Sequence, residues 1–130
     1  MVEVVSHKVL VVEDNALHAR LLKMMLSSFG YHVETAHDGH TALETLRSYC
    51  PDVIICDLMM DEVDGFELAG KIKSHSECHS STLIATTACD SRFREAAMQS
   101  GFHYYLPKPI NMDELQSILT KVLSEKVKKH

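Results

Sequence analysis

The sequence predicts an α/β fold built on a doubly wound parallel sheet with the strand order 2-1-3-4-5. Short runs of branched apolar residues alternate with longer segments of helical periodicity, which implies a parallel sheet covered by helices on both faces. Five such strand–helix units fill nearly all of the 130 residues. We therefore expect one domain, residues 1–130, with its core at about residues 8–123.

The five predicted strands are residues 8–13, 32–36, 53–56, 82–87 and 104–106. The first and third are apolar on both faces, which is typical of central parallel strands, whereas the second alternates with polar residues and suits an edge. Right-handed crossovers then favour the order 2-1-3-4-5. This order reverses direction between strands one and three, and ligands bind at such a point beside the carboxyl ends of the strands.

Residues that begin and end helices delimit the five helical segments. The first begins after Asn15 and ends at Gly30. Its apolar residues at helical spacing are Leu17, Leu21, Leu22, Met25 and Phe29. The second carries an apolar stripe that includes Cys50, and the following proline stops it. The other boundaries are a capping box at Asp64 and Glu67, a stop at Gly101, and a capping box at Asn111 and Glu114.

Composition narrows the function classes. The formal net charge of -5 argues against direct nucleic-acid binding, which needs a basic face. No apolar run approaches the roughly 18 residues that span a bilayer, and the N-terminus lacks the features of a signal peptide. The four cysteines show no CxxC spacing, and Cys56 lies in an apolar run where a reduced, buried thiol is expected. A cytoplasmic location fits best.

Polar residues stand where the predicted strands end. Glu13 and Asp14 come at the end of the first strand, Asp57 follows the third, Thr87 ends the fourth, and Lys108 follows the fifth. Singly, each has an ordinary explanation, since an acid can cap a helix, a lysine can be solvated, and a threonine can reflect strand propensity. Asp57 resists this explanation, because a carboxylate beside a central strand is costly unless it is paired or bound to a metal.

Together these residues predict phosphoryl chemistry. Three carboxylates at one place would repel each other unless a cation joined them. Their hard oxygen ligands suit Mg2+, which typically keeps several waters and takes phosphate oxygens. A metal, a carboxylate nucleophile, a fixed cation and a hydroxyl donor are the parts needed for phosphoryl transfer.

Four segments in order, residues 11–15, 57–65, 85–88 and 106–110, resemble the receiver domain of two-component response regulators, of the chemotaxis-regulator-like kind. Each motif alone is weak, but all four at receiver spacing are specific. The resemblance runs from about residue 8 to residue 123 and implies a flavodoxin-like (βα)5 fold.

The resemblance also implies roles. Asp57 would accept a phosphoryl group from a phosphohistidine. Mg2+ would bind Glu13, Asp14, Asp57 and the backbone carbonyl of Met59. Lys108 would pair with Asp57 and with a phosphoryl oxygen. The only chemistry expected is self-phosphorylation and self-dephosphorylation, so we do not expect an enzyme that turns over an external metabolite.

A conformational switch is implied as well. Thr87 would move toward the phosphoryl group, Tyr105 occupies the aromatic switch position, and the peptide between Lys108 and Pro109 would be cis. The expected partners are a histidine kinase or histidine phosphotransfer protein, and a downstream protein or second receiver at the surface of the fourth helix, fifth strand and fifth helix. No direct nucleic-acid or membrane partner is expected.

Two residues depart from the family pattern, and two alternative functions must be considered. Asp61 stands where the family usually has proline, and Glu13 where aspartate is commoner, so Glu13 could reach Mg2+ through a water. A phosphatase of the haloacid dehalogenase type would want an acid two residues after its nucleophile, where this chain has Met59. A receiver that is never phosphorylated typically lacks one of the site residues, all of which are present here.

Overall fold

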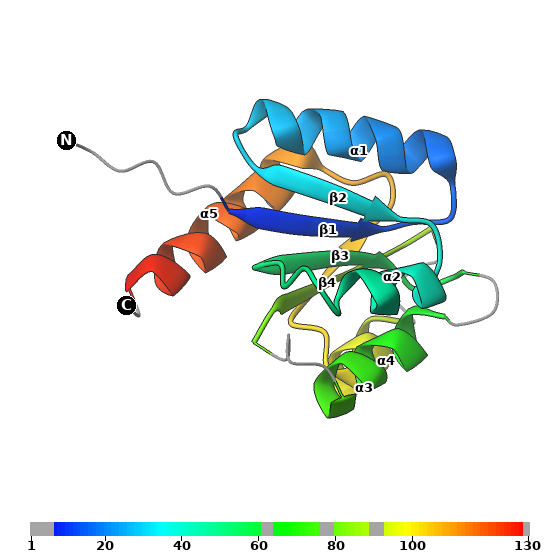
Figure 1. Ribbon diagram of the computed structural model, residues 1–130. Coiled ribbons are helices and arrows are strands. Elements are labelled where there is room, and N and C mark those ends of the chain that lie inside the picture. Colours follow the sequence, from blue (N-terminus) through cyan, green and yellow to red (C-terminus); the bar gives the residue numbers. More distant parts are fainter. Residues whose placement is uncertain (1–6, 61–63, 76–79, 89–92, 129–130) are drawn as a thin grey trace.

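The computed structural model describes residues 7–60, 64–75, 80–88 and 93–128. Within these ranges, five strands alternate with five helices, as predicted (Figure 1). The elements are β1 (Lys8–Val12), α1 (Ala16–Ser28), β2 (His32–Ala36), α2 (Gly39–Thr45), β3 (Val53–Asp57), α3 (Gly65–His75), β4 (Thr82–Thr87), α4 (Arg94–Ser100), β5 (Tyr104–Pro107) and α5 (Met112–Lys128).

The strands form one parallel sheet in the order β2-β1-β3-β4-β5, which confirms the predicted order. The two strands that are apolar on both faces, β1 and β3, lie next to each other inside the sheet, and the alternating strand β2 lies at an edge. Helices α1 and α5 cover one face, and α2, α3 and α4 cover the other (Figure 1). All strands therefore end at the same edge of the sheet.

Two apolar cores, one on each face, hold the helices to the sheet. Leu10, Ile54 and Leu83 face the α2–α4 layer, and their neighbours along the strands face α1 and α5. Alternate residues of one strand point to opposite faces, so a strand buried on both sides must be apolar throughout. This requirement explains the continuous apolar runs of β1 and β3.

Most helix boundaries agree with the prediction. The side chains of Asn15, Asp64 and Asn111 each accept a hydrogen bond from the amide three residues later, at 3.0, 2.9 and 3.0 Å. Gly30 and Gly101 have positive φ angles of 97° and 116°, a conformation that terminates helices and favours glycine.

The predicted end of α2 was wrong. The helix ends at Thr45 rather than continuing to Cys50, and hydrogen bonds to the residue three positions back close the turn after it. Pro51 disfavours helical geometry only in Cys50, so it does not account for an end at Thr45; the chain leaves the helix earlier, through these tighter turns. Cys56 is free and buried, as expected, whereas Cys50 is disulfide-bonded, which the cysteine spacing did not indicate.

The apolar stripe of α1 mostly faces outward. The buried residues of this helix are Ala19 and Leu26, while Leu17 and Met24 are 61% and 62% exposed. Only a narrow strip of α1 is covered, because the helix packs mainly on β1 and the edge strand β2. Within the described ranges, no helix combines the length and apolar character needed to cross a bilayer.

Candidate functional site

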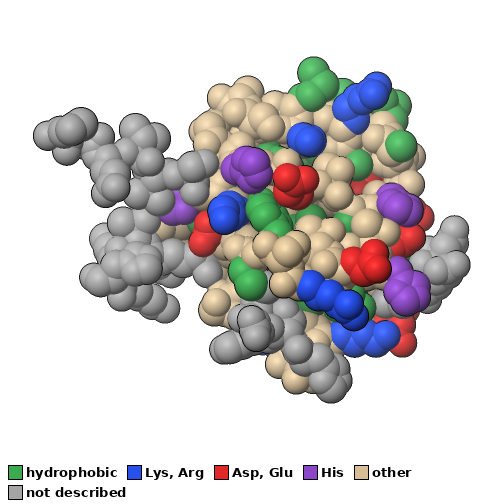
Figure 2. Space-filling view, in the orientation of Figure 1, with side chains coloured by type: hydrophobic (Ala, Val, Ile, Leu, Met, Phe, Trp, Pro, Cys, Tyr) green, Lys and Arg blue, Asp and Glu red, His purple; other side chains and the backbone are tan. Residues whose placement is uncertain are grey.

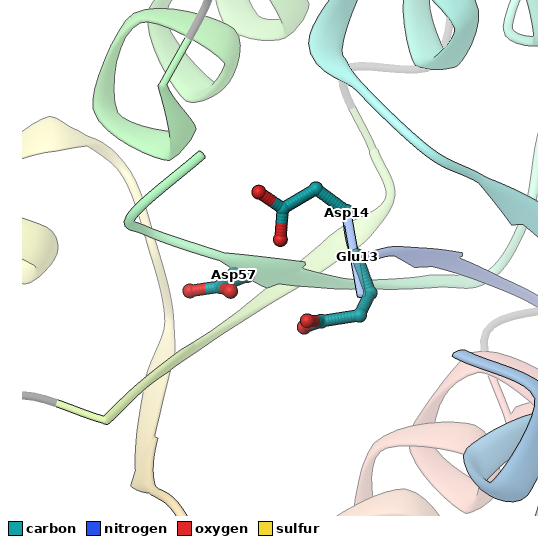
Figure 3. A group of neighbouring side chains, drawn as sticks. All are labelled: Glu13, Asp14 and Asp57. Atoms are coloured by element: carbon teal, nitrogen blue, oxygen red, sulfur yellow. The ribbon is translucent and has the colours of Figure 1, made fainter. Parts of the chain in front are cut away.

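Three carboxylates meet at the carboxyl end of the sheet. Glu13 and Asp14 follow β1, and Asp57 is the last residue of the neighbouring strand β3. One oxygen of each side chain lies within 4.8 Å of the others, and the three side chains surround a common space (Figure 3). Glu13 and Asp57 are each 6% exposed, whereas Asp14 is exposed. The sequence therefore located this cluster correctly.

Lys108 joins the cluster from the loop after β5. Its Nζ lies 2.8 Å from Glu13 Oε2 and 3.1 Å from Asp57 Oδ2. The peptide between Lys108 and Pro109 is cis, as the resemblance implied. The Lys108 backbone amide also donates to the carbonyl oxygen of Thr87 at 2.9 Å, which ties the ends of β4 and β5 together.

The charges of the site do not balance. Three carboxylates and one ammonium leave a net charge of 1 - 3 = -2 when all four groups are ionised. Burial raises the pKa of Glu13, and the hydrogen bond from Lys108 offsets this only in part. Burial lowers the pKa of Lys108, but the hydrogen bonds to Glu13 and Asp57 outweigh it, so the pKa rises. Lys108 therefore stays charged at neutral pH, and the excess negative charge of the site would be offset by a divalent cation.

The donor set fits a hard divalent cation. Carboxylate oxygens are the ligands that Mg2+ prefers, and a site with few protein ligands leaves positions for water and phosphate. Within the described residues, this is the one group of three acidic, histidine or cysteine side chains close enough to share an ion.

The loop after Asp57 is held against the end of β3. The Met59 amide donates to Asp57 Oδ1 at 3.0 Å, and the Leu58 amide donates to the carbonyl oxygen of Thr86 at 2.8 Å. Gly65 then comes so close that a Cβ built there would lie 2.8 Å from both Asp57 O and Leu58 Cα. The motif included this glycine, but its packing requirement could not be read from the sequence. Asp61 lies outside the described residues.

The predicted switch residues flank Asp57 on the side of β4 and β5. Asp57 is in register with Thr86, and Thr87 is the next residue, fully buried at the end of β4. Tyr105 lies opposite Ala85 on β5, half-buried, and packs against the core on the α2–α4 face. These positions bring Thr87 close to the site and put Tyr105 farther back along the sheet.

The sequence did not indicate a cavity beside the acidic cluster. An apolar cavity of about 330 Å3 lies between α1 and the loop that leads into α5, with Glu13, Thr86 and Lys108 in its wall. Leu21 and Met25 of α1 line this cavity and are also exposed. Helical periodicity had marked these residues as sharing a face, but it does not reveal whether another element covers that face.

Comparison with known proteins gives the family. The chain matches the model of the response regulator receiver domain over residues 9–120. It is 37% identical over 119 residues to the response regulator MprA of Mycobacterium ulcerans, a match that covers 91% of this chain and 50% of the relative. It is 34% identical over 116 residues to the transcriptional regulatory protein ZraR of Salmonella typhimurium, with 89% and 26% covered. The chain thus spans half or less of the length of these relatives.

Solved structures agree with this assignment. The receiver domain of the Francisella response regulator 1452 superposes with a TM-score of 0.85 at 29% identity, covering 93% of this chain and 99% of that one. The chemotaxis protein CheY4 of Vibrio cholerae superposes with a TM-score of 0.83 at 30% identity, covering 91% and 99%. The shared fold and the match along the sequence lead to one conclusion: the chain belongs to the receiver domain family of two-component response regulators.

Proposed function

We propose that this chain is a phospho-acceptor switch whose acceptor is Asp57. A phosphohistidine on a histidine kinase or histidine phosphotransfer protein would supply the phosphoryl group. An Asp57 carboxylate oxygen would form the new O–P bond while the N–P bond of the donor breaks, and the departing imidazole would take up a proton. The chain would therefore modify itself and act on no external metabolite.

The observation that carries this proposal is the environment of the Asp57 carboxylate. It is almost completely buried. One oxygen accepts a hydrogen bond from Lys108, and the other accepts one from the Met59 amide. Such contacts orient the carboxylate, and orientation is a large part of catalysis in phosphoryl transfer. The rival phosphatase reading lacks support, because Met59 occupies the position where that mechanism needs an acid.

Mg2+ is the proposed cofactor. Glu13, Asp14 and Asp57 would hold it, with the backbone carbonyl of Met59 as a further ligand. When bound, it would neutralise charge on the transferring phosphoryl group. The net charge of -2 in the site supports a divalent ion. Lys108, already within hydrogen-bond distance of Asp57, would bind a phosphoryl oxygen.

The exposed apolar side of α1 supports docking of the donor protein. Five of the seven large apolar side chains that are exposed in the described chain belong to α1 or to Phe29 just after it. Figure 2 shows hydrophobic and basic side chains next to one another along this helix. Apolar patches of this kind mark interaction surfaces, and this one adjoins the cavity that reaches Glu13 and Lys108.

The output would leave through Thr87 and Tyr105. Movement of the Thr87 side chain toward the phosphoryl group would let Tyr105 turn inward and change the surface of α4, β5 and α5. A second receiver or a downstream protein would bind there. Amide spectra with and without a beryllofluoride mimic test this route, and shifts confined to the surroundings of Asp57 would contradict it.

We expect this chain to bind neither nucleic acid nor a membrane directly, since its net charge is -5. That proposal concerns the 130 residues only. ZraR is named a transcriptional regulatory protein and this chain spans 26% of it, so a longer protein with this domain could control transcription. A cytoplasmic location is proposed because the phosphohistidine donors of such systems are expected there.

The acceptor can be tested with acetyl phosphate and Mg2+. Mass spectrometry should find a single added phosphoryl group, and none on Asp57→Asn. Asp52→Asn is the matched control, because Asp52 flanks the opposite end of β3 and should leave the reaction unchanged. Equal phosphorylation of Asp57→Asn would refute the assignment, as would loss of the reaction in the control.

A further inference from the structure

A second cavity, of about 270 Å3, lies between α1 and the end of β2. Its lining includes three alanines, which leave the space open because their side chains end at Cβ: Ala16, Ala19 and Ala36. Arg20 and Lys23 line it from α1, and Thr35 and His37 line it from β2 and the residue after it. We call this group of four polar residues with its cavity the basic cleft.

The basic cleft is positive in a chain whose net charge is -5. Arg20 and Lys23 stand three residues apart, so they are neighbours on the helix surface. In the part of the chain that the structure describes, neither forms an ion pair or a side-chain hydrogen bond. Two basic side chains therefore line one cavity, and neither is ion-paired with a carboxylate of the described residues.

One acid lines the cleft, and another follows its histidine in the sequence. Glu13 contributes to the lining, but its Oε2 is 2.8 Å from Lys108 Nζ. Asp38 Oδ2 lies 3.2 Å from Nε2 of His37, and hydrogen bonds from Thr41 lower the pKa of Asp38. Neither acid is paired with Arg20 or Lys23, since Glu13 shares Lys108 with Asp57 and Asp38 contacts His37, so the charge of Arg20 and Lys23 remains available to a ligand.

We propose that the basic cleft binds a small phosphate-bearing anion. A guanidinium matches two phosphate oxygens in its planar fork, and an ammonium adds a point charge beside it. The Thr35 hydroxyl is exposed and can donate a further hydrogen bond. The alanine methyl groups would contact the organic part of the ligand.

The size of the cavity selects a small molecule over a segment of protein. A helix with its side chains is about 10 Å across and needs a long open groove, which a cavity of about 270 Å3 does not supply. This site uses none of the phosphoryl chemistry at Asp57. The proposal for the basic cleft therefore does not depend on whether Asp57 is the acceptor.

Pyrophosphate is the probe, added to the full chain in metal-free buffer at constant ionic strength. Amide NMR spectra should show saturable shifts at Ala19, Arg20, Thr35 and His37. The double variant Arg20→Gln, Lys23→Gln should bind at least about fivefold more weakly, since charged hydrogen bonds to phosphate are strong. Lys121→Gln, which removes one exposed charge from α5, should bind like the parent.

A variant of Asp57 distinguishes binding at the basic cleft from binding at the acceptor pocket. Asp57→Asn, which cannot accept a phosphoryl group at residue 57, should bind pyrophosphate as the parent does. Three results would overturn the proposal: no saturable binding, shifts confined to the surroundings of Asp57 and Lys108, or equal weakening by Lys121→Gln. Pyrophosphate could also fail to bind while Arg20 and Lys23 still affect phosphoryl transfer from a donor protein. In that case the two residues serve protein docking and the proposal is wrong.

Discussion

Replacing Gly65 with alanine tests how closely the loop after Asp57 is packed against the end of β3. In Gly65→Ala, the new Cβ would lie 2.8 Å from Asp57 O and from Leu58 Cα, and 3.2 Å from Leu58 Cδ2. Ordinary contacts begin at 3.4 Å, so two backbone atoms must move away by about 3.4 - 2.8 = 0.6 Å. Backbone atoms at the end of a central strand yield less easily than the tip of a side chain.

The expected cost follows from this displacement. Overpacking of a tight site costs about 1–3 kcal/mol, and the loss of glycine's freedom in the unfolded chain returns about 0.4–1 kcal/mol. We expect Gly65→Ala to lower the free energy of unfolding by about 1–2 kcal/mol, which shifts the urea midpoint by about 0.5–1 M. Phosphorylation by acetyl phosphate should also slow, because the shifted atoms include the backbone of Asp57.

Gly70→Ala is the matched control on the same helix. Gly70 is exposed, lies inside α3, and a Cβ there would meet nothing within 4 Å. Alanine should therefore stabilise the fold by about 0.5–1 kcal/mol and leave phosphorylation unchanged. Urea unfolding followed by circular dichroism measures both variants. The reasoning fails if the two substitutions change stability in the same direction, or if Gly65→Ala phosphorylates at the parental rate.

Three further predictions concern other parts of the chain. The double variant Leu17→Gln, Met24→Gln should slow phosphoryl transfer from a phosphohistidine protein but not from acetyl phosphate, and equal slowing would argue against docking on α1. Met59→Asn should shorten the phosphoryl lifetime on Asp57, because an amide can orient an attacking water and a thioether cannot; an unchanged decay rate would contradict this. Burial and nearby carboxylates raise the pKa of Tyr49 from 10.0 to about 12. The unfolded chain thus holds fewer protons between about pH 10 and 12, and stability should fall with rising pH in this window, less so in Tyr49→Phe in parallel urea titrations.

The sheet and the acidic cluster were predictable because parallel strands impose simple geometry. Strands apolar on both faces must lie inside, and all strands of a parallel sheet end at one edge. Glu13 and Asp57, which are 44 positions apart in the sequence, could therefore be placed side by side. The contact of Lys108 with both required only that the loop after β5 reach the same edge.

The features that could not be predicted depend on packing between distant segments. Periodicity grouped the apolar residues of α1, but the narrow cover over this helix left Leu17 and Leu21 exposed. The need for glycine at residue 65 arises from a close approach to the backbone at Asp57, which no local pattern encodes. The basic cleft depends on side chains from α1 and from the end of β2, which meet only in the folded chain.

The sheet separates the proposed input surface on α1 from Tyr105 and α4, whereas α5, which is also part of the proposed output surface, lies in the layer of α1. The apolar side of α1 belongs to the layer that α1 and α5 form, whereas Tyr105 packs with Phe93 against the core of the opposite layer. A signal that reaches Tyr105 must therefore pass to the α2–α4 face, and the paired ends of β3 and β4 connect Asp57 with that face. Thr87 stands on this route, because it is fully buried and its carbonyl oxygen accepts from the Lys108 amide. A change in charge at Asp57 would thus act on Lys108 and Thr87 first, and we expect Tyr105 to respond only through them.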